Sequence, residues 1–161
     1  MPSFRTSRTV RHSAADMFAL VADVEAYPQF LPLCKGLRVR KRSTSDDGLE
    51  MIVADMDAGY KVIRETFTSK VTLDQPNLRI LVEYVDGPFR RLQNHWTFRD
   101  TATGEEPQSV VEFFIDYEFR SRTLGFIVGS VFDAAFRRFS EAFERRADAV
   151  YGRDRRTAAS A

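Results

Sequence analysis

Several residue types are scarce in this chain of 161 residues, and each scarcity excludes a class of protein. The single cysteine, Cys34, cannot form an intramolecular disulfide, which favours a reducing compartment. One cysteine and two histidines, His12 and His95, are too few for a zinc site of ordinary spacing. The formal net charge is only +1, so no field of the whole molecule demands DNA, RNA or an anionic surface.

Targeting and membrane-spanning segments are also missing from the sequence. The first residues, MPSFRTSRTVRH, lack the apolar region of a signal peptide, and their alternation favours a strand over a transit helix. No run approaches the ~20 apolar residues of a membrane span, and the longest candidate is 126–132. We therefore expect a bacterial, cytoplasmic protein, with a peripheral position at the inner membrane as a further option.

Phenylalanine, in contrast, is abundant. The chain has 14 Phe, 5 Tyr and 1 Trp, which predicts a large aromatic interior with few polar groups. Alternation over residues 3–11 predicts a strand, after which Ser13 begins a helix that ends near Asp23, with Asp16 as the partner in a capping box. A second short helix is expected over 25–30.

In the remainder of the chain, apolar residues recur first with the two-residue period of strands and then with the period of a helix. Short turns separate six further strands, predicted at 36–44, 48–58, 60–73, 78–85, 91–101 and 108–120. A long helix with a broad apolar stripe follows over 123–151. Inside it, Gly125 and Gly129 either allow close backbone approach or leave space.

This order of elements predicts an α+β fold in which a curved antiparallel β-sheet wraps around the long C-terminal helix, an arrangement called a helix grip. The two short helices follow the first strand. We expect residues 1–152 to form this single domain and residues 153–161 to form a disordered tail. Either a packed core or an elongated apolar cavity lies between the sheet and the helix.

No cluster of titratable side chains identifies a catalytic centre. His95 falls on the polar face of its predicted strand and His12 ends the first strand, so both are expected to face solvent. Cys34 has no sequence neighbour that would activate its thiolate. Asp55 and Asp57 either point into the cavity or lie at a solvated strand end. We therefore expect a binding protein and not an enzyme, with no catalytic residue and no metal.

The outer side of the C-terminal helix is basic. One interpretation is a solvated face with helical salt bridges to Glu141 and Glu144. The other is contact with anionic lipid headgroups or RNA phosphates. The basic residues are Arg137, Arg138, Arg145, Arg146, Arg153, Arg155 and Arg156.

Two stretches of the sequence resemble a known family. The first is DVEAYPQFLPLC at 23–34, and the second is DGPFRRLQNHWTF at 86–98. At these spacings they resemble the coenzyme Q-binding START-domain family of the polyketide cyclase/START-like superfamily, which also includes the ribosome-association toxin RatA. The resemblance covers about residues 3–150. It departs at Leu33, where many relatives have Trp, but the position stays apolar.

The resemblance implies a START-like, lipid-binding domain. Its implied function is to bind ubiquinone or a related isoprenoid lipid as a quinone carrier or chaperone that supports respiratory electron transport, with no further cofactor. One alternative is a RatA-like toxin that binds the large ribosomal subunit and blocks subunit association. A polyketide cyclase/aromatase-like enzyme ranks last, because the late strands offer few inward acids or bases. The expected partners are the lipid, a transient membrane surface or the ribosome, but not DNA.

The candidate ligand-binding residues form two groups. The apolar residues of 27–33 are expected to form a stiff lip at the mouth of the cavity, which closes over a lipid or dips into a bilayer; the alternative is a packed corner that caps the core. The second group comes from the late strands and the long helix. Together the candidates are Tyr27, Phe30, Leu31, Pro32, Leu33, Val82, Tyr84, Phe89, Trp96, Phe98, Phe113, Tyr117, Val128, Phe132 and Phe136.

Overall fold

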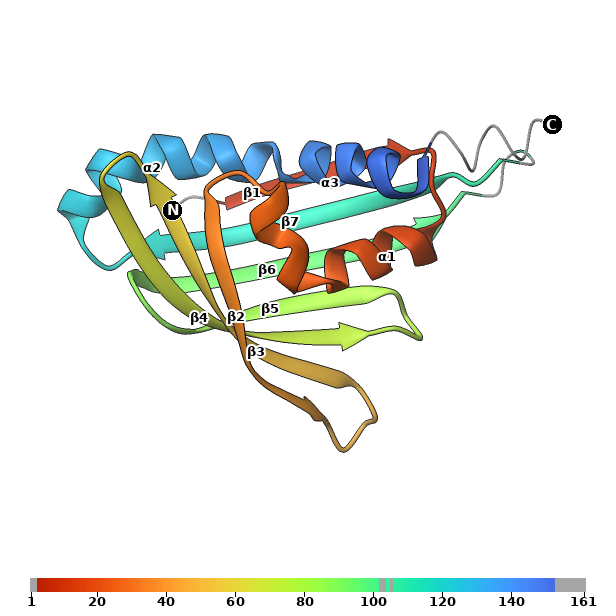
Figure 1. The fold of residues 1–161 in the computed structure, drawn as a ribbon, viewed down its shortest axis with the longest axis horizontal. Coiled ribbons are helices and arrows are strands. Elements are labelled where there is room, and N and C mark those ends of the chain that lie inside the picture. The colour runs from red at the N-terminus through yellow and green to blue at the C-terminus, as the bar shows by residue number, and fades with distance from the viewer. Residues whose placement is uncertain (1–2, 102–103, 105, 153–161) are drawn as a thin grey trace.

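The computed structural model describes residues 3–101, 104 and 106–152. Seven antiparallel strands form one curved sheet, and a C-terminal helical segment lies across its concave side (Figure 1). This confirms the predicted α+β helix grip, including the two short helices after the first strand. The tail predicted at 153–161 lies outside the described residues. None of the described helices is long and apolar enough to cross a bilayer.

The elements follow the predicted order along the chain. The strands are β1 (Ser3–Val10), β2 (Cys34–Thr44), β3 (Glu50–Tyr60), β4 (Ile63–Asp74), β5 (Arg79–Asp86), β6 (Phe89–Asp100) and β7 (Ser109–Phe119). The helical elements are α1 (Ala14–Ala22), the 3-10 helix η1 (Val24–Gln29), α2 (Arg122–Arg137), α3 (Phe139–Ala147) and the π-helical turn η2 (Asp148–Gly152).

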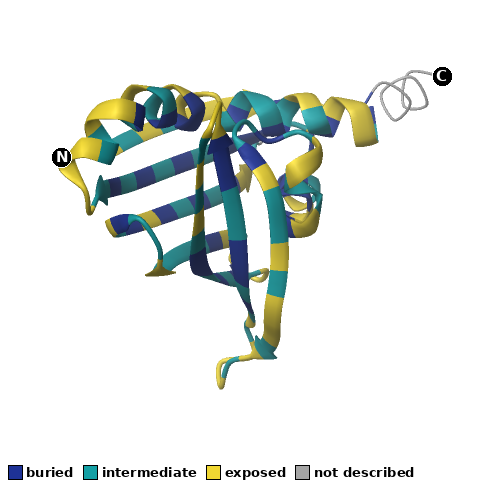
Figure 2. Cartoon of the chain, turned by 60° about the vertical axis from the view of Figure 1, so that its left-hand side comes forward, coloured by how far each residue is buried: buried dark blue, intermediate teal, exposed yellow. Residues whose placement is uncertain are grey.

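The sheet is a meander whose first strand joins its last. Its order is β1-β7-β6-β5-β4-β3-β2, so every strand from β2 to β7 pairs with its neighbours in sequence. β1 instead pairs with β7, from Ser3 opposite Asp116 to Val10 opposite Ser109. Buried and more exposed residues alternate along the strands, as Figure 2 shows, because one face packs against the helices and the other faces solvent.

Local signals explain how the first helices begin. The hydroxyl of Ser13 accepts a hydrogen bond of 3.1 Å from the backbone N–H of Asp16, which is the cap that the sequence predicts for α1. Pro28 is accommodated inside η1, and the chain then turns into β2 at Cys34. The corner formed by η1 and the start of β2 thus lies against the concave side of the sheet (Figure 1).

The single long helix expected over 123–151 is wrong in one respect, because it is interrupted. The N–H of Arg138 bonds to the carbonyl of Ala135, three residues back, at 3.0 Å, so α2 ends there in a tighter turn. Helical pairing resumes when Ala142 N–H bonds to the carbonyl of Arg138 at 2.9 Å. Neither proline nor glycine stands at the interruption, so the sequence contains no signal for it.

One of the two histidines lies differently from the expectation. His12 is wrongly expected to face solvent: its side chain is only 4% exposed, because η2 packs over the end of β1. His12 Nε2 lies 2.7 Å from Asp148 Oδ1. His95 is half-buried, with its ring 5.9 Å from that of Phe114 between centroids.

The basic side of the helical segment is partly neutralised. Arg137 pairs with Asp133 at 2.9 Å and Arg145 pairs with Glu141, each across one helical turn. The interpretation as helical salt bridges is confirmed for Glu141, whereas Glu144 pairs instead with Arg8 of β1 at 2.6 Å. Arg138 forms no ion pair with any residue that the structure describes. Arg153, Arg155 and Arg156 lie outside the described residues.

Candidate functional site

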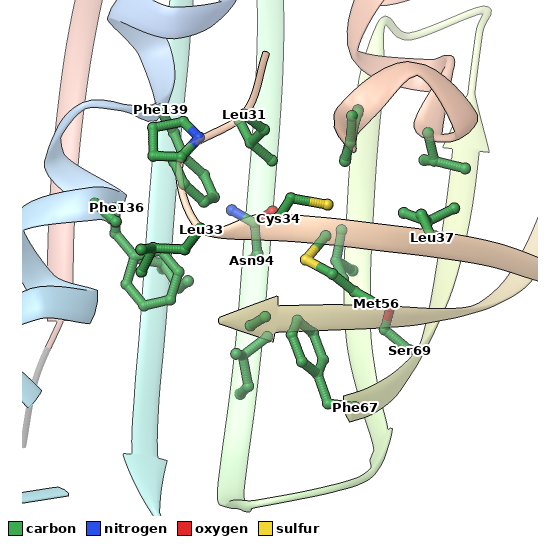
Figure 3. Close-up of a pocket in the computed structure, with 18 of the residues that line it drawn as sticks. Leu31, Leu33, Cys34, Leu37, Met56, Phe67, Ser69, Asn94, Phe136 and Phe139 are labelled. Atoms are coloured by element: carbon green, nitrogen blue, oxygen red, sulfur yellow. The ribbon is translucent and has the colours of Figure 1, made fainter. Parts of the chain in front are cut away.

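An apolar cavity of about 80 Å³ lies between the concave face of the sheet, the η1–β2 corner and the helical segment (Figure 3). Residues from β2 to β7, from the corner and from both α2 and α3 contribute to its walls. They are Val24, Tyr27, Leu31, Pro32, Leu33, Cys34, Leu37, Ala54, Met56, Ala58, Phe67, Ser69, Val71, Val82, Leu92, Asn94, Trp96, Ile115, Phe132, Ala135, Phe136, Phe139 and Phe143.

The structure brings part of the predicted ligand-binding set together around this cavity. The predicted residues that line it are Tyr27, Leu31, Pro32, Leu33, Val82, Trp96, Phe132 and Phe136. The predicted residues that do not line it are Phe30, Tyr84, Phe89, Phe98, Phe113, Tyr117 and Val128. The second group packs in the layer around the cavity and supports its walls.

Aromatic packing explains why those side chains stay outside the cavity. Phe89 is almost completely buried between Tyr84 and Phe119, with ring centroids 5.8 Å and 5.0 Å away. The hydroxyl of Tyr84 accepts a hydrogen bond of 3.1 Å from the N–H of Phe89, which holds the ring away from the cavity. Phe30 packs edge-on against Phe143 at 5.1 Å. Phe98, Phe113, Tyr117 and Val128 are buried in the same aromatic core.

The wall formed by β2, β3 and β4 is not among the ligand-binding residues predicted from the sequence. Its side chains are Cys34, Leu37, Ala54, Met56, Ala58, Phe67, Ser69 and Val71. The available signal is the alternation of Ala54, Met56 and Ala58 with charged residues along β3. Small and polar residues weaken that alternation, so the sequence alone does not show which face of β3 points inward.

Asp55 and Asp57 therefore do not point into the cavity, and that alternative is wrong. They alternate with the lining residues and lie on the other face of the sheet. Asp55 accepts hydrogen bonds from Arg40 Nε at 2.7 Å and from Thr68 Oγ1 at 2.6 Å. Arg38 Nη1 donates to Asp57 at 2.8 Å, which holds the pKa of that carboxyl below its usual range. Both carboxylates hold neighbouring strands together.

The stretch at 27–33 is a packed corner that also forms one wall. Leu31 is only 5% exposed and belongs to the core, and the hydroxyl of Tyr27 donates to the carbonyl of Val21. Leu33 has a φ of 67°, an uncommon value for a bulky residue, and its carbonyl accepts a 2.9 Å bond from Gly59 N–H. Leu33 thereby turns the chain and presents its side chain to the cavity, as Figure 3 shows.

Few polar groups face the cavity, and they are uncharged. Asn94 is already engaged: its Oδ1 accepts from Trp96 Nε1 at 3.0 Å and its Nδ2 donates to the carbonyl of Phe114 at 2.8 Å. Burial raises the pKa of the Cys34 thiol to about 11, so the thiol stays protonated at neutral pH. Ser69 is only 7% exposed, and it is one of the few polar residues that line the cavity.

These walls determine what the cavity can hold. No Asp, Glu, Lys, Arg or His is among the described residues that line it, and no described group of three potential ligands could hold a metal ion. A single water molecule needs a cavity volume of roughly 10–15 Å³. The cavity of about 80 Å³ therefore accommodates a small chemical group and not a whole lipid. Of the two alternatives that the sequence leaves open, a packed core or an elongated apolar cavity, the structure shows an apolar cavity of about 80 Å³, and a larger ligand must displace a wall.

A surface groove shares one wall with the cavity. Pro32, Leu33 and Ala135 line both the groove and the cavity, so these three side chains separate the cavity from the outside. The groove runs between the η1–β2 corner, the end of β3 and α2. Its other residues are Tyr60, Ser130, Val131, Ala134 and Arg138.

The chain is similar to known proteins along most of its length. Residues 10–144 match the family model described as polyketide cyclase / dehydrase and lipid transport. The ribosome association toxin RatA of Escherichia coli strain K12 is 35% identical over 151 residues, 94% of this chain and 90% of the toxin. The mitochondrial coenzyme Q-binding protein coq10 of Schizosaccharomyces pombe is 30% identical over 123 residues, 76% of this chain and 72% of that protein. The solution structure of an 18 kDa protein of Caulobacter crescentus has a TM-score of 0.73 at 29% identity, covering 95% of this chain and 100% of that one.

Proposed function

The chain belongs to the polyketide cyclase / dehydrase and lipid transport family, and from this premise we propose that it binds an uncharged isoprenoid lipid such as ubiquinone in the cavity. The family resemblance of the two sequence stretches is thereby confirmed. One observation carries the proposal: every described lining residue of the cavity is uncharged and nearly all are apolar. An isoprenoid tail gains about 0.8 kcal/mol per buried CH₂, so such walls supply affinity without ionic contacts.

The role that fits these walls is carriage of the lipid and not chemistry on it. General acid–base catalysis needs a positioned titratable group, and the described lining offers only Cys34 and Tyr27. Burial raises the pKa of both, so neither is poised to exchange a proton near neutral pH. This disfavours the cyclase alternative and supports a carrier or chaperone for a respiratory quinone.

Ser69 is the group that would meet the head of the ligand. Ser69 lines the cavity, and a ligand carbonyl there would accept a hydrogen bond from its hydroxyl, an interaction with a net value of about 1 kcal/mol. A quinone carries carbonyl acceptors and no charge, which matches a hydroxyl donor in an uncharged cavity. The wall at Pro32, Leu33 and Ala135 would move outward to admit the tail.

Organic extraction of purified protein tests this proposal. Protein from a ubiquinone-producing host should release an isoprenoid quinone that mass spectrometry identifies, and Ser69→Ala should release less. Ser109→Ala is the control, because Ser109 is also a buried serine but does not line the cavity. An extract free of lipid, together with no rise in Tm on adding short-chain ubiquinone, would contradict the proposal.

A second candidate function is association with the large ribosomal subunit. The comparisons favour it over the coenzyme Q role, because the toxin relative is more similar and matches more of this chain than the coenzyme Q-binding relative. Cations such as Arg138, which has no ion pair among the described residues, would contact RNA phosphates. Both functions would operate in the cytoplasm, the first of them with access to the inner membrane.

Sucrose-gradient sedimentation distinguishes this second function. The protein should migrate with large subunits, reduce the fraction of joined ribosomes, and be released as salt rises. Arg138→Glu should weaken the association, whereas Arg145→Glu, whose cation already pairs with Glu141, should weaken it less. Protein that stays at the top of the gradient at low salt would exclude ribosome association.

A further inference from the structure

Exposed apolar side chains gather beside the groove that leads to the cavity. Among the described residues, the large apolar side chains that are exposed are Tyr60, Val62, Val85, Phe126, Ile127 and Val150. Tyr60 and Val62 belong to the β3–β4 turn, and Phe126 and Ile127 belong to α2. These two elements meet at the groove, where Tyr60 faces Val131.

The β3–β4 turn carries an unusual residue at its tip. Tyr60 pairs with Ile63, so Lys61 and Val62 alone form the turn. Lys61 takes a φ of 55°, a conformation that glycine, asparagine or aspartate adopts more easily. Val62 is 95% exposed and contributes almost nothing to the packing of the protein. The tip therefore presents an apolar side chain to the surroundings.

The start of α2 extends this apolar surface along the groove. Phe126 is 91% exposed and Ile127 is also exposed. Side chains four residues apart lie on the same side of a helix, which places Ile127 in line with Val131 and Phe126 in line with Ser130. Val131 and Ser130 line the groove, so Phe126 and Ile127 continue its wall by one turn.

Cations surround these side chains. Lys61, Arg64, Arg122 and Arg138 are exposed, and none of them forms an ion pair with a described residue. Asp133 of α2 is engaged by Arg137, whose guanidinium lies 4.5 Å from the ring centroid of Phe4 in β1. The carboxylate of Asp133 is thus held on the β1 side of the helix, while the turn packs on the other side.

We propose that this surface docks on an anionic phospholipid bilayer, with Val62 and Phe126 inserted among the acyl chains and the four cations on the headgroups. Apolar side chains that protrude singly suit a deformable hydrocarbon layer, whereas the core of a protein interface is flat and closely complementary. Unpaired cations around an apolar centre match the negative surface of a bilayer.

Docking in this orientation places the wall formed by Pro32, Leu33 and Ala135 over the membrane, since the groove opens between the two inserted elements. A lipid could then move between the bilayer and the cavity without crossing water. This part of the inference rests on the proposed function, whereas the docking itself does not.

Vesicle co-sedimentation tests the docking. The protein should bind vesicles of phosphatidylcholine with phosphatidylglycerol, bind phosphatidylcholine alone weakly, and be released as salt rises. The double variant Val62→Asp with Phe126→Asp should reduce the bound fraction by about tenfold, with an unchanged Tm because both side chains are exposed. Val150→Asp is the matched control, since Val150 is exposed at the other end of the helical segment, and should bind like the parent protein.

Equal vesicle binding by the double variant and the parent protein, or no binding of the parent to anionic vesicles, would overturn the docking proposal. If the double variant loses ribosome binding and the parent protein binds no vesicles, the surface belongs to the ribosome contact, and the docking proposal is overturned as well. Titration of the double variant with detergent-solubilised short-chain ubiquinone separates the docking proposal from the proposed binding of a lipid in the cavity. If quinone raises the Tm of the double variant as much as that of the parent protein, the cavity function stands even when docking fails. If the parent protein binds vesicles but takes up no quinone, docking stands even when the cavity function fails.

Discussion

Ser69 and Ser109 are both buried serines, but only Ser69 lines the cavity. Ser109 lies at the start of β7, away from the cavity, and its hydroxyl is buried without a partner among the described residues. Only the hydroxyl of Ser69 is therefore placed to bind a ligand. The pair therefore separates a structural imperfection from a binding group.

Replacing Ser69 by alanine should weaken ligand binding, whereas replacing Ser109 by alanine should only stabilise the protein. Removal of the unsatisfied buried hydroxyl of Ser109 should raise the free energy of unfolding by up to about 1 kcal/mol, and loss of the hydrogen bond from Ser69 to a quinone carbonyl should lower affinity by about tenfold. Urea unfolding measures the first effect and a fluorescence titration measures the second. Ser109→Ala should show the stabilisation alone; an equal loss of affinity in both variants would remove Ser69 from the site.

The thiol of Cys34 should make stability depend on alkaline pH. Burial is the main cause that raises its pKa to about 11 from the ordinary 9.0; the charge of Asp57 adds to the shift and the bond to the Gly36 carbonyl opposes it. Because the folded pKa is raised, the contribution is complete below about pH 9 and is lost between about pH 9 and about pH 11.

Cys34→Ala should therefore flatten the fall in the free energy of unfolding across that interval, as measured by urea unfolding at several pH values. The raised pKa of Tyr27 and of Tyr117, the latter about 12, acts in the same direction in parent and variant, so their difference isolates the thiol. Curves that stay parallel across the interval would show that the thiol ionises alike in both states.

At the scale of elements, the two glycines of α2 serve different purposes. A Cβ at Gly125 would meet Cβ of Phe119 at 3.4 Å, so this glycine allows the helix to lie close to the end of β7. A Cβ at Gly129 would meet nothing within 4 Å, so this glycine only leaves space. The two alternatives that the sequence leaves open are therefore each true of one position.

Gly129→Ala should stabilise the protein by about 1 kcal/mol, because alanine favours the helix and no atom obstructs its methyl group. Gly125→Ala should gain less, since its methyl group contacts the ring of Phe119. Thermal and urea unfolding of both variants provide the comparison. A loss of stability in Gly129→Ala would mean that α2 lies closer to its surroundings than the structure shows.

Alternation and helical period suffice to predict the elements but not their interruptions. The faces of β6 and β7 follow from residues such as Trp96 and Phe113, which alternate with polar neighbours over a long strand. The interruption at Arg138 depends on a three-residue hydrogen bond to Ala135, which no residue type there requires. Sequence patterns describe what a segment prefers by itself, and this interruption arises from packing.

The candidate site is less predictable than the fold for a related reason. Trp96 and Phe113 share the concave face and pack 4.7 Å apart, yet only Trp96 borders the cavity. A two-residue period identifies the face of the sheet on which a side chain lies. Whether that side chain borders the cavity depends on where the helices and the η1–β2 corner pack against that face. The sequence does not predict Leu37, Met56 and Phe67 as lining residues. Polar residues on both faces of their strands obscure the alternation that would identify the inner face.

At the scale of the whole molecule, charge is distributed outside the cavity and not within it. Twenty-four cations and 23 anions nearly cancel, and the described ones are kept to the surface or to ion pairs. An ionised ligand would enter the cavity without a counter-charge, which is costly in an apolar environment. The cavity should therefore select against charged lipids by desolvation alone.

Short-chain ubiquinone should raise the Tm of the protein, whereas a fatty acid of similar length should not at neutral pH. At a ligand concentration of about 100 times Kd, binding adds about 2.7 kcal/mol to the free energy of unfolding. Differential scanning fluorimetry with both ligands provides the measurement. An equal shift with the ionised fatty acid would show that a cation reaches the cavity when the ligand is bound.

The pairing of β1 with β7 has a consequence for biosynthesis. Strands β2 to β7 pair in the order in which the chain is made, but β1 pairs only with β7. During translation, the nascent β1 must therefore wait for almost the entire domain to emerge before it finds its partner. A chain that stops before Ser109 retains β1 and β6 as two open strand edges with apolar faces. Such fragments are templates for aggregation, so this protein depends more than a simple meander does on the last third of its own synthesis.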